Sequence, residues 1–417
     1  MLKLISRAWK SRPARKFRRN RLAVAALAVI GLYFAIGITV LVSDALVNLK
    51  LINPNDHRLL TVLTLDQVES IVGPMSQPGW LEHPRPEQRL RAVKGILDEF
   101  RKALRQKDKD AALAALNLGE RRVDKPIDDI RTILDDARAQ YDELNAAPDL
   151  DKDPSILPKL DKIETTVDSL FKPLSGIDKT INSFRLALGT DRQGRSISAR
   201  AFYSIKVAIQ IGLVVAIISV LMGSLIGAAA GYFGGWVDSA VIWLFSTLQS
   251  VPDLVLLAVL AFMFTGSVFD DVSKPFLSLI PVYVAMCLTF WIGPCRVIRG
   301  ETMKLKELEY VQAATAIGFG KPYILLKHII PNTLHLGFIN FSLLFIAAIK
   351  FEVVLSFLGL GVKVGPSWGR MIQESTQEVI NGFFWQIGTA TVFMFFLVLA
   401  FNIVSDALQD AFDPKAV

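Results

Sequence analysis

Six apolar runs constrain this chain more than any other feature of its sequence. Each run is close to the roughly 20 residues that a helix needs to cross the hydrocarbon core of a bilayer. In lipid, every backbone polar group of a spanning segment must be satisfied within the protein, so we expect these runs to form helices. We therefore predict an all-α, polytopic membrane protein with six transmembrane helices. The predicted helices cover residues 22–42, 207–230, 239–265, 276–294, 337–357 and 383–405.

Basic residues set the expected orientation of these helices. Residues 1–21 contain nine Lys or Arg and no acid, and they directly precede the first apolar run. Cytoplasmic loops are enriched in Lys and Arg, so we expect the N-terminus, the connection 296–336 and the C-terminus to be cytoplasmic. This placement accounts for the net charge of +7 without a nucleic-acid partner. The first run is longer than the apolar core of a signal peptide, so we expect it to be retained.

A hydrophilic insert separates the first two runs, and this topology places it on the extracytoplasmic side. Apolar residues recur there at three- and four-residue spacing, which predicts an antiparallel helical hairpin or bundle. The predicted helices are 90–104, 127–144 and 160–184, with Pro173 kinking the last. Residues 53–187 contain 24 acidic and 21 basic residues, which we interpret as a solvated surface without a charged binding patch. The predicted domains are the basic N-terminus 1–21, the first transmembrane helix 22–46, the insert 47–199 and a core 200–417.

The stretch 309–334, between the fourth and fifth runs, is too polar to span and too patterned for a slack linker. Tyr310, Ala313, Ala314 and Ile317 follow helical spacing and predict one apolar face of a short helix. Gly318 and Gly320 are expected to end this helix, and Lys321 and Pro322 to start a second one that Pro331 closes. The paired alanines would let another surface approach closely. From the spacing alone, an elbow that packs on its own bundle remains an alternative.

This stretch, EYVQAATAIG followed by HIIPN, resembles the EAA loop of ABC importer permeases, and most closely the C-type membrane subunit of the oligopeptide, dipeptide and nickel importers. Further motifs of that family occur in the expected order. They are Phe17–Leu32, Leu188–Arg200, Leu355–Gly361, Pro366–Gly369 and Leu399–Pro414. Together the similarity covers about 15–46 and 185–415.

The resemblance implies a type I ABC importer fold in the cell inner membrane. It implies a homologous permease subunit, separate ATPase subunits that bind and hydrolyse ATP, and an extracytoplasmic binding protein that delivers di- or oligopeptides. It also implies that the loop couples this chain to the ATPase. The loop residues that carry this role are Tyr310, Gln312, Ala313, Ala314, Gly318 and Pro331. The sequence contains no P-loop and no metal-ligand spacing, so we expect no catalytic, cofactor or metal site.

Two features depart from the family pattern. Gln312 stands where the family has glutamate, which removes one charge from the expected ATPase contact. The insert has no counterpart in ordinary members, so the resemblance assigns it no role.

Three charged residues lie within predicted transmembrane helices, where ionisable groups are costly and usually face a cavity or a partner. They are Asp253, Lys350 and Glu352. Lys350 and Glu352 are two positions apart, so they point to different sides of a helix and should not pair. Each is a candidate for lining the pathway. For Lys350 the alternative is a structural pairing within the complex, and for Asp253 it is satisfying the backbone freed by Pro252. Outside these helices, Asp191 and Arg195 are expected to hold the approach to the second one.

Two other classes of function stay open from the residues alone. Lys350 and Glu352 could form the ion relay of a secondary transporter, although no repeated broken helices accompany them. Alternatively, the insert could make the chain a membrane scaffold that docks a partner outside.

Overall fold

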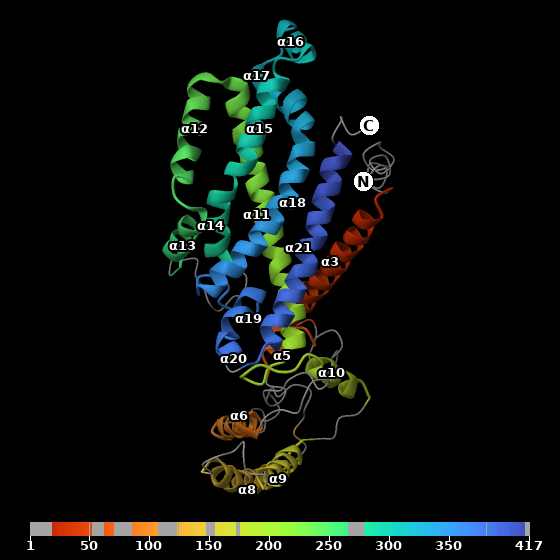
Figure 1. The fold of residues 1–417 in the computed structure, drawn as a ribbon, viewed down its shortest axis with the longest axis vertical. Coiled ribbons are helices and arrows are strands. Elements are labelled where there is room, and N and C mark those ends of the chain that lie inside the picture. The colour runs from red at the N-terminus through yellow and green to blue at the C-terminus, as the bar shows by residue number, and fades with distance from the viewer. Residues whose placement is uncertain are drawn as a thin grey trace. The chain divides into compact units, whose positions relative to one another are not determined.

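The computed structural model is helical, with no β-strand among the residues that it describes (Figure 1). The described residues are 19–49, 51, 62–70, 86–106, 123, 125–146, 155–171, 176–265, 279–380 and 382–412. Most of the basic N-terminus and Pro173 lie outside this set. The chain divides into two compact units, of which the first comprises 1–35, 207–365 and 393–417, and the second 36–206 and 366–392.

Three long helices contribute residues to both units. They are α3 (Arg21–Asn48), α11 (Ile197–Phe233) and α21 (Trp385–Phe412). The first unit also contains α12 (Gly235–Gln249), α13 (Asp253–Phe264), α14 (Ile280–Phe290), α15 (Ile292–Leu305), α16 (Glu309–Ala316), α17 (Lys321–Ile324), a π-helical turn η2 (Leu325–Ile329) and α18 (Ile330–Phe357). The second unit contains α5 (Leu65–Val68), α6 (Pro86–Leu104), α8 (Ile127–Asn145), α9 (Ile156–Asp168), α10 (Gly176–Leu186), α19 (Trp368–Glu374) and α20 (Thr376–Ile380).

Five helices are long and apolar enough to cross a membrane, and a bent pair, α12 with α13, would make a sixth. We predicted one kinked helix over 239–265. The structure instead bends by 89° between α12 and α13. The break lies at Pro252, which has no N–H to donate and whose ring crowds a continuing α-helix. In place of the third expected span, the structure therefore has two short helices joined at a sharp bend.

Glycines allow α11 to approach α15 at the distance of backbone contact. A Cβ built on Gly223 would lie 2.5 Å from the carbonyl oxygen of Trp291, and one on Gly231 would lie 2.7 Å from that of Arg299. Between them, a Cβ on Gly227 would overlap the carbonyl of Cys295. The spacing of four residues places all three glycines on one face of α11, which is a recurrent way to pack membrane helices closely.

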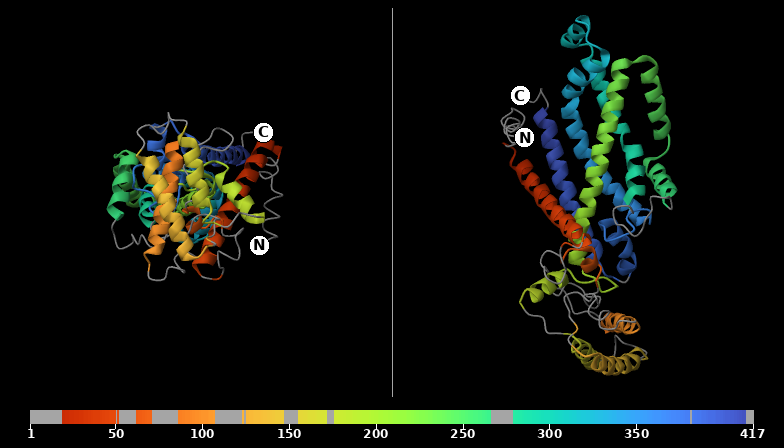
Figure 2. Two further views of the ribbon diagram at one scale, coloured as in Figure 1. Left: turned by 90° about the horizontal axis from the view of Figure 1, so that it is seen from below. Right: turned by 180° about the vertical axis from the view of Figure 1, so that it is seen from behind.

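The helices α6, α8 and α9 form a three-helix bundle within the second unit. They lie side by side in Figure 2, left, where α6 is orange and the other two are yellow-orange. Leu90, Phe100, Ile130, Leu160 and Ile163 are among the residues of its apolar core. This agrees with the helical spacing in the sequence.

The prediction of one kinked helix over 160–184 is wrong. The structure has two separate helices there, α9 and α10. Val167 belongs to the core of the bundle, whereas Phe184 packs against Phe202 of α11, with ring centroids 5.5 Å apart. The apolar spacing over 160–184 therefore runs through two helices, of which α9 packs in the bundle and α10 packs against α11.

Candidate functional site

The short helix α16 ends as its glycine predicts. Gly318 has φ of +96°, a conformation that a side chain would strain. The N–H of Gly318 donates to the carbonyl of Thr315 (3.0 Å) and the N–H of Phe319 to that of Ala314 (3.2 Å). This pair of bonds is the Schellman motif, which satisfies carbonyls at a helix end. The turn after α16 is therefore fixed by hydrogen bonds.

The two alanines of this loop lie on different sides of α16. Ala314 and Val311 are buried in an apolar cluster that includes Ile298 of α15 and Ile324 of α17. Ala313 is exposed. The expectation that both alanines lie on one open face is therefore wrong for Ala314, which anchors the helix to its own chain.

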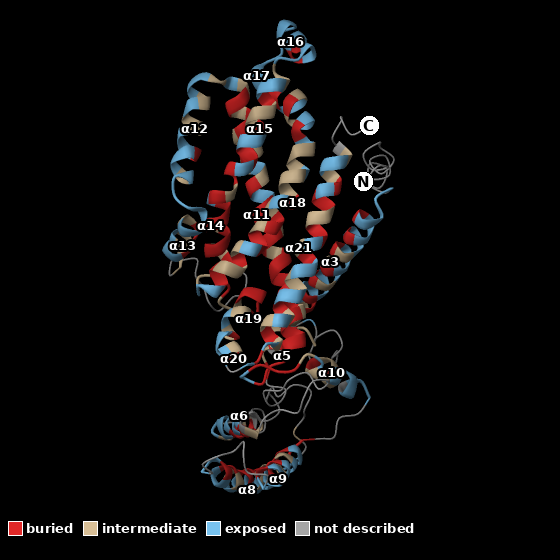
Figure 3. Cartoon of the chain, viewed as in Figure 1, coloured by how far each residue is buried: buried red, intermediate tan, exposed pale blue. Residues whose placement is uncertain are grey.

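Three large apolar side chains around α16 are exposed, and most of the α16 ribbon has the pale blue of exposed residues in Figure 3. The exposed fractions are 42% for Tyr310, 75% for Ile317 and 45% for Phe319. The hydroxyl of Tyr310 accepts a hydrogen bond from Asn332 Nδ2 at 3.0 Å, which ties this face to the start of α18. Exposed apolar patches of this kind are typical of surfaces that contact proteins or membranes.

Gln312 projects from a different side of α16 than this apolar face. It helps to line an open cavity of about 530 Å³, together with Tyr232, Lys306 and Lys321. Its Nε2 donates to the carbonyl of Glu307 at 3.1 Å. Gln312 therefore supports the connection before α16, and its role in coupling stays a prediction.

Pro331 does not end a helix, contrary to our prediction. Residues 321–357 form one continuous apolar helix, in which the π-helical turn η2 ends two residues before Pro331. Proline lacks an N–H and its ring crowds the carbonyl four residues earlier. The wider π turn, in which Ile330 N–H donates to the carbonyl of Leu325, gives that ring room. The loop is therefore joined without a break to a membrane helix.

The three charged residues of the predicted transmembrane helices lie in different surroundings. Glu352 is 1% exposed, and Ser356 Oγ donates to its Oε1 at 2.7 Å. Ser356 Oγ also accepts from the N–H of Val362 at 3.1 Å, so Glu352 supports the turn after α18. Lys350 is exposed, and Asp253 is exposed in the first turn of α13. The structure does not bring these residues together, and their role in the pathway stays a prediction.

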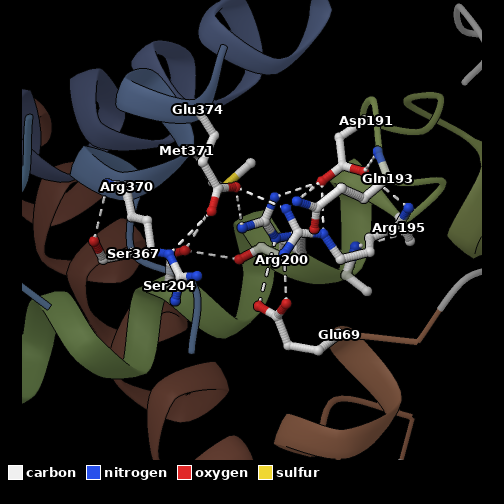
Figure 4. Close-up of polar contacts among 12 residues, drawn as sticks. Glu69, Asp191, Gln193, Arg195, Arg200, Ser204, Ser367, Arg370, Met371 and Glu374 are labelled. Atoms are coloured by element: carbon white, nitrogen blue, oxygen red, sulfur yellow. Dashed lines mark hydrogen bonds and ion pairs between the residues drawn. The ribbon is translucent and has the colours of Figure 1, made fainter. Parts of the chain in front are cut away.

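A buried network of charges lies in the second unit around Asp191 (Figure 4). Its Oδ2 accepts from Arg195 Nε at 2.8 Å and from Arg200 Nη1 at 2.7 Å. Both guanidiniums also donate to Glu374 Oε2, at 2.8 Å from Arg195 and 2.7 Å from Arg200. Arg195 Nη1 donates to Glu69 Oε2 at 2.6 Å. These contacts confirm that Asp191 and Arg195 hold the start of α11, and they add the end of α5 and α19.

Two carboxyl groups near this network have opposite pKa shifts. Burial alone would raise the pKa of Glu374, but the charges of Arg200 and Arg195 hold it below its usual value. Burial raises the pKa of Glu378 to about 7, and the nearby charge of Asp191 adds to the effect. The N–H of Arg192, which donates to Glu378 Oε1 at 3.0 Å, opposes the rise only in part.

Glu378→Gln should therefore change how stability depends on pH. The folded-state pKa of Glu378 is raised from 4.5 to about 7, so this group stabilises the folded state below pH 4.5, and the contribution is lost as pH rises through 7. The full shift corresponds to roughly 3 kcal/mol. Thermal melts at several pH values should show a flatter profile for Glu378→Gln than for the wild type, and a higher melting temperature above pH 7. Glu374→Gln, which removes a carboxylate that the arginines stabilise, should instead lose stability at neutral pH.

Comparison with known proteins gives the family of the chain. Residues 223–417 match the family described as binding-protein-dependent transport system inner membrane component. The chain is 33% identical to the dipeptide transport system permease protein DppC of Bacillus subtilis over 228 residues, which cover 54% of this chain and 68% of that protein. The chain belongs to this family of permeases.

The same part of the permease resembles further members. It is 33% identical to the oligopeptide transport system permease protein OppC of Escherichia coli K12 over 230 residues, or 54% of this chain and 72% of that protein. It is 32% identical to OppC of Bacillus subtilis over 228 residues, or 54% of this chain and 71% of that protein. Together with the apolar helices, these matches make the permease a multi-pass protein of the inner membrane.

Several residues of these two sites were missed by sequence reasoning. Asn332 is the last residue of the HIIPN motif, but the residue to which it donates a hydrogen bond, Tyr310, lies 22 positions earlier in the chain. Glu69 and Glu374 lie 126 and 179 positions from Arg195. No local pattern signals such pairs, because they depend on the fold that brings distant segments together.

Proposed function

We propose that this permease forms half of the translocation pathway of an ATP-driven importer of di- or oligopeptides. A homologous permease subunit would supply the other half, and a separate ATPase would bind ATP and contact α16. An extracytoplasmic binding protein would deliver the peptide, with both termini of this chain in the cytoplasm. The observation that carries the proposal is the exposed apolar face of α16, which a short hydrogen-bonded turn connects to the continuous helix 321–357. A movement of the ATPase against this face would therefore be transmitted to the membrane helices without passing through a flexible linker.

Ile317→Glu tests the contact with the ATPase. Ile317 is 75% exposed, so glutamate fits without disturbing the fold, but a carboxylate is costly in an apolar groove of a partner. We expect the ATPase no longer to co-purify with the permease, and ATP-dependent uptake to fall at least tenfold. Ile380→Glu is the control, because Ile380 is 72% exposed on α20. Wild-type co-purification and uptake with Ile317→Glu would contradict the assignment of α16.

Uptake in proteoliposomes tests the energy source and the cargo. Labelled di- and oligopeptides should enter only when the ATPase, the binding protein and ATP are all present. The names of the relatives support peptides as the cargo class. Peptide uptake by the permease alone that disappears with the ion gradient would instead identify an ion-coupled transporter.

A further inference from the structure

The outer face of α6 is strongly basic. Its exposed charged residues are Arg91, Lys94, Asp98, Arg101 and Lys102, and the exposed Arg105 directly follows the helix on the same side. None of the five basic side chains forms an ion pair with another described residue, whereas Asp98 Oδ1 lies 3.7 Å from Arg138 Nη1 of α8. The remaining base of this helix, Arg89, points inward and binds Asp161 and Glu164 of α9. The face therefore presents five bases and one acid, and the bases are not paired with acids in the part of the bundle that the structure describes.

The helix dipole explains only part of this pattern. Lys and Arg are favourable near a helix C-terminus, which suits Arg101 and Lys102 in the last turn. Arg91 and Lys94 lie beyond the first turn of α6, where the helix dipole has little effect on a cation. The dipole therefore does not account for these two bases.

The neighbouring helix α8 has the opposite charge. A pair of acidic residues recurs every seven residues along α8. Because seven residues make about two helical turns, the three pairs lie on the same face. The exposed acids are Asp128, Asp129, Asp135, Asp136, Asp142 and Glu143. Our interpretation of the insert as a surface without a charged patch is therefore wrong, because the nearly equal totals conceal a separation of charge between two helices.

The bundle is connected to a membrane helix by a short length of chain. Four residues separate Phe171, in the bundle core, from Gly176 at the start of α10, so the gap is at most about 17 Å. The end of α10 is fixed to the start of α11, because Ser196 Oγ donates to the carbonyl of Arg185 at 2.5 Å. The guanidinium of Arg185 also donates to Gln67 and Ser70, at 2.8 and 3.1 Å. The bundle is therefore tethered to α11 through α10 and the four residues that precede it.

We infer that the basic face of α6 docks on the anionic phospholipid headgroups of the membrane that this chain spans. Lys and Arg are attracted to an anionic leaflet within about a Debye length, and five on one face act together. The acidic face of α8 would be repelled by the same surface, so the bundle has a preferred orientation. Docking does not require apolar side chains of α6 to insert into the bilayer, because the basic side chains contact the phosphates of the headgroups. The inference concerns the insert alone and does not depend on the transported cargo.

Fluorescence quenching by labelled headgroups tests this orientation on the full chain. A fluorophore is attached to Gln106→Cys, next to the basic face, while the native Cys287 and Cys295 are buried. The protein is placed in nanodiscs of phosphatidylcholine, with or without about one third phosphatidylglycerol, and with a quencher on the lipid headgroup. We expect quenching to be at least twofold stronger with phosphatidylglycerol, and the excess to disappear in 0.5 M salt.

Charge variants separate this contact from other causes. Arg101→Glu combined with Lys102→Glu and Arg105→Glu should abolish the excess quenching, while Asp135→Asn with Asp136→Asn on α8 should keep it. All five positions are exposed, and circular dichroism confirms that the variants stay folded. Equal quenching in both lipid mixtures would overturn the inference. So would an excess that vanishes in nanodiscs holding a single chain, because the partner would then be a second copy.

Discussion

Gly227→Ala is expected to destabilise the membrane helices, although alanine is intrinsically the better helix former. The added methyl group would overlap the carbonyl of Cys295, a backbone atom that no rotamer change can move aside. Overpacking at a tight contact costs about 1–3 kcal/mol, which outweighs the gain of up to about 1 kcal/mol in helix propensity. Gly227→Leu should prevent α11 and α15 from packing, so that little folded protein is recovered.

Gly300→Ala is the matched control, because a Cβ there has no atom within 4 Å. It lies on α15, in the helix that faces Gly227, and should be neutral or slightly stabilising. Thermal unfolding of the purified permease in one detergent compares the two variants directly. Equal melting temperatures for Gly227→Ala and Gly300→Ala would show that the helices relax apart at no cost.

The features that could be predicted from the sequence depend on neighbours along the chain. Apolar length indicates the membrane helices, and three- and four-residue spacing indicates the helices of the insert. Gly318 could be placed at the end of a helix because its positive φ is a local requirement. The candidate coupling segment was found in this way, since α16 and its turn are specified within a dozen residues.

The features that could not be predicted depend on which segments meet. Gly223, Gly227 and Gly231 repeat every four residues, but the repeat does not identify α15 as the partner. Proline at position 331 predicts the end of a helix from the sequence alone. The helix continues because the π-helical turn before Pro331 gives the ring room. The two charged faces of the insert were concealed for the same reason, because totals of charge carry no information on how helices pack.

Asp191→Asn is expected to cost about 3–5 kcal/mol in folding stability, because it leaves Arg195 and Arg200 side by side without the carboxylate between them. Asparagine keeps the size of the side chain, so lost charge rather than lost packing is measured. Thermal or chemical unfolding of the permease gives the difference.

A second substitution distinguishes a charge imbalance from a general defect at this position. Arg200 is fully buried, so Arg200→Met alone should also destabilise, because it removes one of the cations that bind Asp191 and Glu374. In the double variant, Arg200→Met removes the cation that Asp191→Asn left without its partner, so the two costs should not add. The expected coupling energy is on the order of 1–3 kcal/mol. Strictly additive costs would mean that the two side chains act independently, and that the network is held by Glu69 and Glu374 rather than by Asp191.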